Sequence, residues 1–303
     1  MNPVLSQSRP ANFMLIAGYM PVKHFRSVPA NTAFLRYALS NAIMILKMTV
    51  AREKRMKIVE YGKEHRKVII LLHGGGLSWW NYREAAELLQ DRYRVVIPIL
   101  DGHAGSDANF SSIEQNAQRL VTFIDEAFGG TVDLIAGVSL GGQILAEMLT
   151  QRSGIARYAL IESASVISMK LTHALIKPMM DMSWWLIKRR WFARLQFRYL
   201  RLKAELFDDY YRDSSAITKQ NMLSFLQANS AYVAKESLKY SLAEAHIYVG
   251  GKEPRQMLRS ARKLHQLLPG SKLSVLKGCH HGEFSINHPQ EYTETIIRIL
   301  ENT

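Results

Sequence analysis

Cysteine is almost absent from this chain of 303 residues, since Cys279 is the only one. An intramolecular disulfide is therefore excluded, which suits a reducing compartment such as the cytoplasm. The sequence also has no cysteine and histidine spacing of the kind that binds zinc. His280 and His281 follow Cys279 directly, but adjacent side chains usually diverge, so we expect no metal site.

Long apolar runs are missing as well. A membrane-spanning helix needs about 20 mostly apolar residues, whereas Phe13–Met20 is much shorter and the stretch 32–50 is interrupted by Arg36 and Lys47. The start of the chain has only Arg9 as a positive charge and no clear cleavage site, so it does not resemble a secretory signal. We therefore expect a cytoplasmic protein, either free or associated with a membrane at its periphery.

Acidic residues are scarce relative to basic ones, and the net charge is +13. The excess is confined to two segments: residues 1–55 contribute +7 and residues 165–244 contribute +6, while the remainder is neutral. A nucleic-acid-binding protein would carry a recognisable reading motif on a basic face, and the sequence has none, so we expect no nucleic acid as a partner. A solvated basic surface is the first explanation of the excess. A membrane surface or an anionic substrate is the alternative, and either explains the excess better than a nucleic acid does.

Residues 1–55 form an N-terminal extension with two interpretations. The stretch 32–50 is compatible with a basic amphipathic helix that lies on a membrane or on the rest of the protein. Alternatively, the native start is Met56, which follows the charged run Arg52–Arg55, and the extension comes from an over-extended reading frame. If Met56 is the native start, we expect residues 56–303 to fold and act alone.

Short apolar runs alternate with helical patterns through most of the remaining sequence. A continuous run such as Val68–Leu72, rich in β-branched residues, is typical of a strand buried on both faces of a parallel sheet. Alternating strands and helices predict an α/β fold with a doubly wound, mostly parallel sheet, in which ligands bind at the carboxyl ends of the strands. The expected strands are 57–61, 68–72, 94–99, 132–136, 158–161, 246–249 and 272–276.

The pattern changes between residues 165 and 242, where no buried-strand run occurs and only helices are predicted. Pro178 should end the first of them, and Asp208 and Asp209 should close the second. Aromatic residues are interleaved here with lysines and arginines. The expected helices are 167–176, 183–206, 215–229 and 232–240.

The stretch Gly137–Gly142 organises the chain. It reads Gly-Val-Ser-Leu-Gly-Gly and lies between a predicted strand and a predicted helix. This is the context of a nucleophile elbow, in which a sharp turn holds the Ser139 hydroxyl above the sheet. Gly137 and Gly141 avoid a clash at the tight crossing, and the N-terminus of the following helix favours developing negative charge.

With this motif in this context, the chain resembles the serine hydrolases of the α/β-hydrolase family, of the esterase- or lipase-like bacterial type, from about Lys57 to the C-terminus. The resemblance implies an α/β-hydrolase core formed by residues 56–164 and 243–303. It also implies that residues 165–242 are an inserted helical cap, which covers the nucleophile and shapes the substrate pocket.

The resemblance further implies a catalytic triad in the chain order nucleophile, acid, histidine. Ser139, Glu253 and His281 have this order, and each follows a predicted strand. The family more often has aspartate at the position of Glu253, so Glu162, at the end of the preceding strand, is the alternative acid. His280 is the alternative base.

The tetrahedral intermediate of acyl transfer carries an oxyanion, which backbone N–H groups stabilise. By the same resemblance, one donor is Leu140, directly after the nucleophile, and the other is Gly75 in the run His73–Gly76. His73 is expected to order this loop and not to act as a base. Glycine-rich loops also bind phosphate in nucleotide-binding proteins, but the Lys-Ser/Thr pair of a P-loop does not follow this one.

The expected function is hydrolysis of a carboxylic ester or a similar acyl bond of a small molecule, through an acyl-enzyme and without a cofactor. Three alternatives use the same triad, namely a thioesterase, an amidase or peptidase, and a carbon–carbon bond hydrolase. An alternative of another class is a sensor that keeps the triad to bind a small molecule in the cap pocket.

Overall fold

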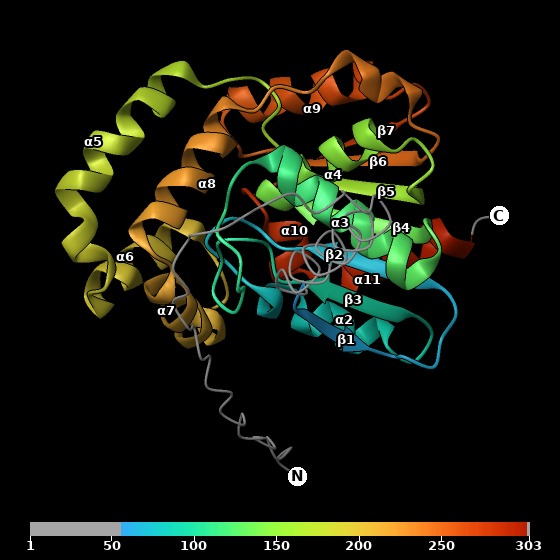
Figure 1. The fold of residues 1–303 in the computed structure, drawn as a ribbon, viewed down its shortest axis with the longest axis horizontal. Helices are drawn as coiled ribbons and strands as arrows, with labels where there is room; N and C mark the ends of the chain where they lie inside the picture. The colour runs from blue at the N-terminus through green and yellow to red at the C-terminus, as the bar shows by residue number, and fades with distance from the viewer. Residues whose placement is uncertain (1–55, 302–303) are drawn as a thin grey trace, which may run out of the picture. The chain divides into compact units, whose positions relative to one another are not determined.

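A seven-stranded sheet forms the centre of the computed structural model, which describes residues 56–301 (Figure 1). The strand order is β1-β3-β2-β4-β5-β6-β7, and all neighbours are parallel except β1, which pairs antiparallel with β3. This confirms the predicted α/β fold with a mostly parallel sheet. The expectations for residues 1–55 lie outside the described residues. The strands are β1 (Ile58–Tyr61), β2 (Val68–Leu72), β3 (Arg94–Pro98), β4 (Val132–Val138), β5 (Ala156–Glu162), β6 (Glu244–Gly250) and β7 (Lys272–Leu276).

Helices cover both faces of the sheet, so the central strands are apolar at successive positions. In β2, Ile70 and Leu72 pack on one face and Ile69 and Leu71 on the other, and all four side chains are buried. One face packs against α3 (Ile113–Phe128), α4 (Leu140–Gln151) and α9 (Arg255–Leu267). The opposite face packs against α2 (Arg83–Leu89), α10 (Glu283–Asn287) and α11 (Pro289–Glu301), and a short 3-10 helix, η1 (Trp79–Tyr82), precedes α2.

The strand order reverses around β2, and this creates a crevice at the carboxyl ends of β2 and β4. From β2 the chain proceeds to β3 on one side, whereas β4 lies on the other side. Because the connections leave in opposite directions, the loops that follow β2 and β4 diverge and leave room for a ligand. These two loops carry Gly75 and Ser139.

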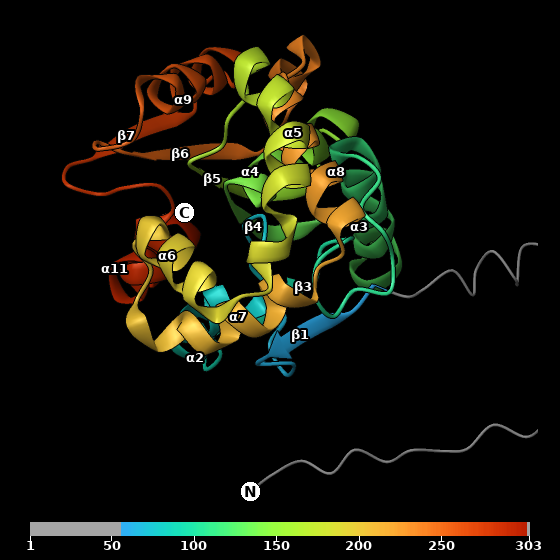
Figure 2. The same ribbon diagram turned by 90° about the vertical axis from the view of Figure 1, so that its left-hand side faces the viewer.

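A helical insertion lies between β5 and β6, and α5, α6 and α7 stand to one side of the sheet in Figure 1 and in front of it in Figure 2. The limits that we propose for the cap, 165 and 242, fall in the connections to these two strands. No helix within residues 56–301 is long and apolar enough to cross a membrane. The insertion comprises α5 (Lys170–Ile187), α6 (Arg190–Leu200), η2 (Ala204–Leu206), α7 (Phe207–Ala216), α8 (Lys219–Ala231) and η3 (Glu236–Tyr240).

Two predicted helix ends in this insertion are wrong. Helix α5 continues through Pro178, because the proline removes only one backbone hydrogen bond. Both Pro178 and Ala174, whose carbonyl loses its partner, are exposed, so water can satisfy that carbonyl. Asp208 and Asp209 lie in the first turn of α7 instead of closing the helix before it, in keeping with the preference of acidic side chains for a helix N-terminus.

Buried polar side chains fasten the insertion to the core. Gln143 in α4 is fully buried, and its amide nitrogen donates to the carbonyls of Ser165 at 2.6 Å and Asn229 at 2.9 Å. The Asn229 side chain donates back to Gln143 Oε1 at 2.9 Å. Trp80 in η1 donates its indole N–H to Asp213 of α7 at 2.8 Å. These bonds join α4 and η1 of the core to α7 and α8 of the insertion.

The substitution Gln143→Leu should lower the free energy of unfolding by roughly 1–3 kcal/mol, because leucine leaves the buried Ser165 and the half-buried Asn229 without these partners. Urea unfolding followed by circular dichroism measures the change. Gln118→Leu is the control, since Gln118 is exposed on α3, and its effect should stay within about 0.5 kcal/mol. Equal stability of the two variants would contradict the role given to Gln143.

Candidate active site

The nucleophile turn lies at the carboxyl end of β4. Ser139 directly precedes α4 and has φ 54° and ψ −113°, with a positive φ that residues other than glycine rarely adopt. A Cβ at Gly137 would lie 2.4 Å from the Gly141 carbonyl oxygen, and one at Gly141 would lie 2.1 Å from the Leu72 carbonyl oxygen. Only glycine fits at either position, and the close crossing holds Ser139 at the strand ends.

His281 lies between Ser139 and Glu253. Its Nε2 is 2.9 Å from Ser139 Oγ, and its Nδ1 is 2.7 Å from Glu253 Oε2. The three residues follow β4, β7 and β6, whose carboxyl ends share one edge of the sheet. A carboxylate that accepts a hydrogen bond from Nδ1–H keeps the proton on Nδ1, which leaves Nε2 free to accept the serine proton. The imidazole is 43% exposed, whereas the Glu253 side chain is buried.

Three donors surround the Glu253 carboxylate. Besides the imidazole of His281, the Gly250 N–H and the Ser163 hydroxyl each donate to Oε1 at 2.7 Å. Burial raises the pKa of Glu253, but the hydrogen bond and charge of His281, with the bonds from Ser163 and Gly250, outweigh burial and hold this pKa below its usual value. The carboxylate is therefore charged at neutral pH and can stabilise an imidazolium.

Ser163 was not predicted as a site residue. It directly follows β5, has φ 52°, and its hydroxyl also accepts the Gly282 N–H at 3.4 Å. It therefore joins the acid to the loop that carries the histidine. A polar residue directly after a buried strand was the available signal, because the ends of parallel strands gather at the site.

Glu162, the alternative acid, contacts a different partner. Its carboxylate accepts the N–H groups of Phe284 at 3.1 Å and Ser285 at 3.2 Å, at the start of α10. Among the described residues, the carboxylate that hydrogen-bonds to the His281 imidazole is that of Glu253 and not that of Glu162. Burial raises the pKa of the Glu162 carboxyl to about 7, although the bonds from Ser285 oppose this rise.

The alternative base, His280, lies in the same loop as His281. Its backbone N–H donates to Glu283 Oε2 at 2.7 Å, and the imidazole that faces Ser139 belongs to His281. Throughout residues 56–301, no three side chains of His, Cys, Asp or Glu gather in the way that a metal site requires.

The loop after β2 lies beside the nucleophile turn, since a Cβ at Gly75 would be 3.4 Å from the Leu140 side chain. The Gly74 carbonyl accepts the Leu77 N–H at 3.2 Å and lies 3.0 Å from Nδ1 of His73. Because a trans peptide points its N–H opposite to its carbonyl, these bonds aim the Gly75 N–H away from His73. Leu140 is the first residue of α4, so its N–H has no partner within the helix.

His73 supports this loop as a neutral ring. It is fully buried, and its Nε2 accepts the Leu100 N–H at 3.1 Å, so the proton is on Nδ1 and is donated to the Gly74 carbonyl. Burial, with a smaller contribution from the neighbouring His103, lowers the pKa of His73 to about 3. With both ring nitrogens engaged and no charge at neutral pH, His73 is suited to hold the loop and not to take a proton.

Residues 69–295 match the sequence model described as the alpha/beta hydrolase family. An esterase from Exiguobacterium antarcticum has a TM-score of 0.70 at 16% identity, covering 82% of this chain and 96% of that one. A thermophilic esterase from Thermogutta terrifontis has a TM-score of 0.67 at 14% identity, covering 82% and 93%. The enol-lactonase from Burkholderia xenovorans LB400 has a TM-score of 0.62 at 14% identity, covering 81% and 96%. These similarities show a shared fold, and no curated protein matches the chain.

The buried Glu162 should make stability depend on pH. Its pKa is about 7 in the folded protein against an ordinary value of 4.5, so between these values the folded state binds more protons than the unfolded state. This group alone should therefore reduce the free energy of unfolding, by about 3 kcal/mol in all, as the pH rises across that interval.

Glu162→Gln cannot titrate and should flatten this decline. Urea unfolding of both proteins at a series of pH values across the interval measures the two slopes. Parallel slopes would show that Glu162 is already ionised in the folded protein near its ordinary pKa.

Proposed function

The chain belongs to the alpha/beta hydrolase family, and we propose that it is a serine hydrolase that cleaves a carboxylic ester or a similar acyl bond of a small molecule. The observation that carries this proposal is the position of His281, within hydrogen-bonding distance of both Ser139 Oγ (2.9 Å) and Glu253 Oε2 (2.7 Å). A serine hydroxyl is a poor nucleophile until a base takes its proton, and the base needs a partner that fixes its tautomer.

In the proposed reaction, Ser139 Oγ attacks the carbonyl carbon while Nε2 of His281 takes the hydroxyl proton. The charged Glu253 stabilises the imidazolium, and its lowered pKa keeps it from taking the proton itself. The bond to the leaving alcohol then breaks as His281 gives its proton to the alcohol oxygen, which leaves Ser139 acylated. A water molecule deprotonated by His281 releases the acid and restores the hydroxyl.

We assign the oxyanion hole to the backbone N–H groups of Gly75 and Leu140. The two residues are neighbours, since a Cβ at Gly75 would lie 3.4 Å from the Leu140 side chain, and the Leu140 N–H lies at the N-terminus of α4, where the helix adds partial positive charge. His73 holds the Gly74 carbonyl and so keeps the Gly75 N–H in a fixed orientation before substrate arrives. One donor of this kind typically contributes about 10²–10³-fold to kcat.

Several other reactions would use the same groups. Thioesters, amides and some carbon–carbon bonds are also cleaved through attack of an activated serine beside an oxyanion hole. A sensor differs in kind, because it needs the pocket but does not need repeated turnover. Turnover of simple esters is therefore the property that separates the proposed function from the sensor.

The purified protein should hydrolyse p-nitrophenyl esters over many turnovers, and Ser139→Ala should lower kcat by about six orders of magnitude, because the nucleophile is lost. A fluorophosphonate probe should label the wild type at Ser139 and leave the variant unlabelled. One slow turnover or none by the wild type, with intact ligand binding, would favour the sensor.

Two carboxamide variants, one at each candidate acid, are compared in the same assay. Glu253→Gln should lower kcat by about 10³–10⁴-fold, because an amide at this position favours the wrong histidine tautomer. Glu162→Gln should retain most of kcat, since Glu162 contacts α10 and not the imidazole. The reverse ranking would make Glu162 the triad acid.

We also propose that the protein is cytoplasmic and touches an anionic membrane surface through α6. Arg190, Arg194 and Arg198 recur at every fourth position of this helix and form a basic row. Trp191 is exposed beside this row on the same helix. Arginines beside exposed aromatic side chains are typical of helices that lie in the interface of an anionic bilayer.

Reversing two charges of this row, with Arg194→Glu and Arg198→Glu together, should weaken binding to vesicles that contain phosphatidylserine by about tenfold or more, because each basic residue contributes about 1 kcal/mol there. Vesicle co-sedimentation measures the loss. Arg259→Glu with Arg262→Glu, exposed on α9, makes the same change of charge elsewhere and should bind like the wild type. Equal losses from both pairs would argue for a general charge effect and against α6.

A further inference from the structure

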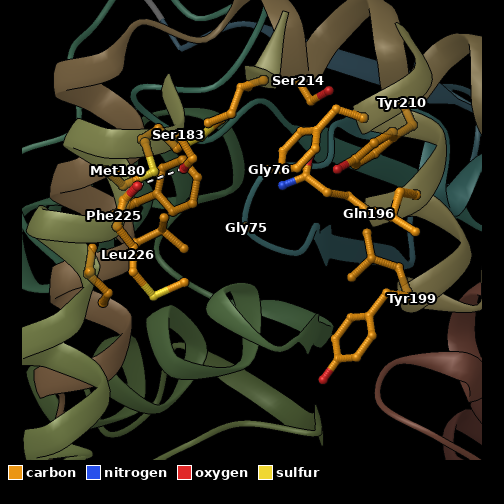
Figure 3. A pocket seen from close by; sticks show the side chains of 17 residues that line it. Gly75, Gly76, Met180, Ser183, Gln196, Tyr199, Tyr210, Ser214, Phe225 and Leu226 are labelled. Carbon is orange, nitrogen blue, oxygen red and sulfur yellow. Dashed lines mark hydrogen bonds between the residues drawn. The ribbon is translucent and has the colours of Figure 1, made fainter. Parts of the chain in front are cut away.

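A cavity of about 610 Å³ lies between the helices of the insertion and the loop after β2, and the proposed triad residues do not line it (Figure 3). Figure 3 shows Met180, Phe225 and Leu226 on one wall, facing Gln196 and Tyr199 on the other. The volume falls in the range of binding sites for small organic molecules, about 300–1000 Å³. The cavity is therefore large enough to hold a substantial part of a substrate.

The lining of this cavity is mostly apolar and carries no charged side chain, although Gln196, Tyr199, Tyr210 and two serines contribute polar groups. It contains no Asp, Glu, Lys, Arg or His among the described residues. The hydroxyl of Ser183 donates to the Met179 carbonyl of its own helix at 2.7 Å, which is the dashed bond in Figure 3. A charged ligand would lose its hydration here without finding a side chain of opposite charge, and most of the wall is hydrocarbon, so its chemistry favours a hydrocarbon chain.

This cavity adjoins a second one that reaches the proposed triad. A smaller cavity of about 110 Å³ is lined by Ser139 and His281, and Gly75 and Leu200 line both cavities. Gly75 provides one of the two proposed oxyanion donors. An ester carbonyl held by this donor would therefore lie where the two cavities meet.

The position of His281 decides which part of an ester enters which cavity. The leaving alcohol must receive its proton from Nε2, and of the two cavities His281 lines only the smaller. The alcohol consequently belongs in the 110 Å³ cavity, and the acyl chain extends past Gly75 into the 610 Å³ cavity.

We infer that the substrate is an ester of a long apolar acyl chain with a small alcohol, an inference that rests on the serine-hydrolase function proposed above. Met179, Met180 and Met222 line the long cavity, and flexible thioether side chains adapt to chains of different length. Burial of each methylene group contributes about 0.8 kcal/mol, which corresponds to about a fourfold gain in kcat/KM per methylene while apolar wall is available.

Two ester series test this inference on the wild-type protein. Methyl acetate, butanoate, octanoate and dodecanoate vary the acyl chain, and the acetates of methanol, butanol, octanol and dodecanol vary the alcohol. With dissolved, unaggregated substrate, kcat/KM should rise by about fourfold per methylene along the first series until the cavity is filled. It should stay level or fall along the second series, and any other pattern overturns the assignment of the two cavities.

A matched pair of methionines on α5 tests the cavity itself. Met179 lines it and Met182 does not, and both are exposed, by 58% and 75%, so neither substitution disturbs the core. Met179→Asp places a carboxylate on the apolar wall and should lower the ratio of kcat/KM for methyl dodecanoate to that for methyl acetate by about tenfold or more. Met182→Asp should keep the wild-type ratio, and an equal ratio in the two variants contradicts the inference.

Binding without turnover separates failure of this inference from failure of the proposed function. Dodecanoate is titrated calorimetrically into Ser139→Ala, alone and combined with either methionine substitution. Weaker binding with Met179→Asp, but not with Met182→Asp, supports the chain site even if no ester is hydrolysed. Ester hydrolysis with no preference for long acyl chains and no dodecanoate binding leaves a hydrolase and overturns the chain site.

Discussion

The crossing of α4 over the end of β2 is the constraint on which the candidate site depends. The backbone of Gly141 approaches the Leu72 carbonyl so closely that no Cβ fits, and Ser139 is held at a positive φ. Such a conformation costs about 1–3 kcal/mol and persists only where the surroundings dictate it. Here both β4 and α4 are buried along nearly their whole length, so relaxing the turn would displace a strand and a helix from the core. The same crossing exposes the first N–H groups of α4 at the strand ends.

Two carboxyl groups at neighbouring strand ends show how surroundings divide roles between similar side chains. Glu253 is buried among an imidazole, a hydroxyl and a backbone N–H, and these donors hold its pKa below the usual value. Glu162 is buried against the start of α10, and burial raises its pKa to about 7. Two nearby carboxylates repel each other, so lowering the charge on Glu162 favours ionisation of Glu253. The arrangement concentrates negative charge where a protonated His281 would need it.

Sequence patterns predicted the parts of the molecule that follow from local structure. Continuous apolar runs located the buried strands, and the glycines around Ser139 predicted a turn too tight for side chains. The choice between Glu253 and Glu162 was left open, because it depends on which carboxyl reaches an imidazole that folding brings from a distant part of the chain. Ser163 was not predicted for the same reason, since its hydroxyl donates to the carboxylate of Glu253, which is 90 residues away in the sequence. The predicted helix end at Pro178 was wrong, because the free-energy cost of a proline within a helix depends on whether water can reach the freed carbonyl. The sequence does not show that exposure.

Helix α6 presents two different chemistries on opposite sides. Residues two positions apart on a helix differ in direction by about 200°, so the row that contains Phe192 and Gln196 faces away from the row that contains Arg194 and Arg198. The first row lines the apolar cavity, and the second carries positive charge outward. Neither row includes a residue of the proposed triad, because Ser139, His281 and Glu253 all follow strands of the core. If the proposals above hold, substitutions in the insertion change the bound chain or the membrane contact, while Ser139, His281 and Glu253 stay in place. The esterases described above share the fold at 14–16% identity. That similarity is informative about the core, whereas the substrate has to be inferred from the insertion.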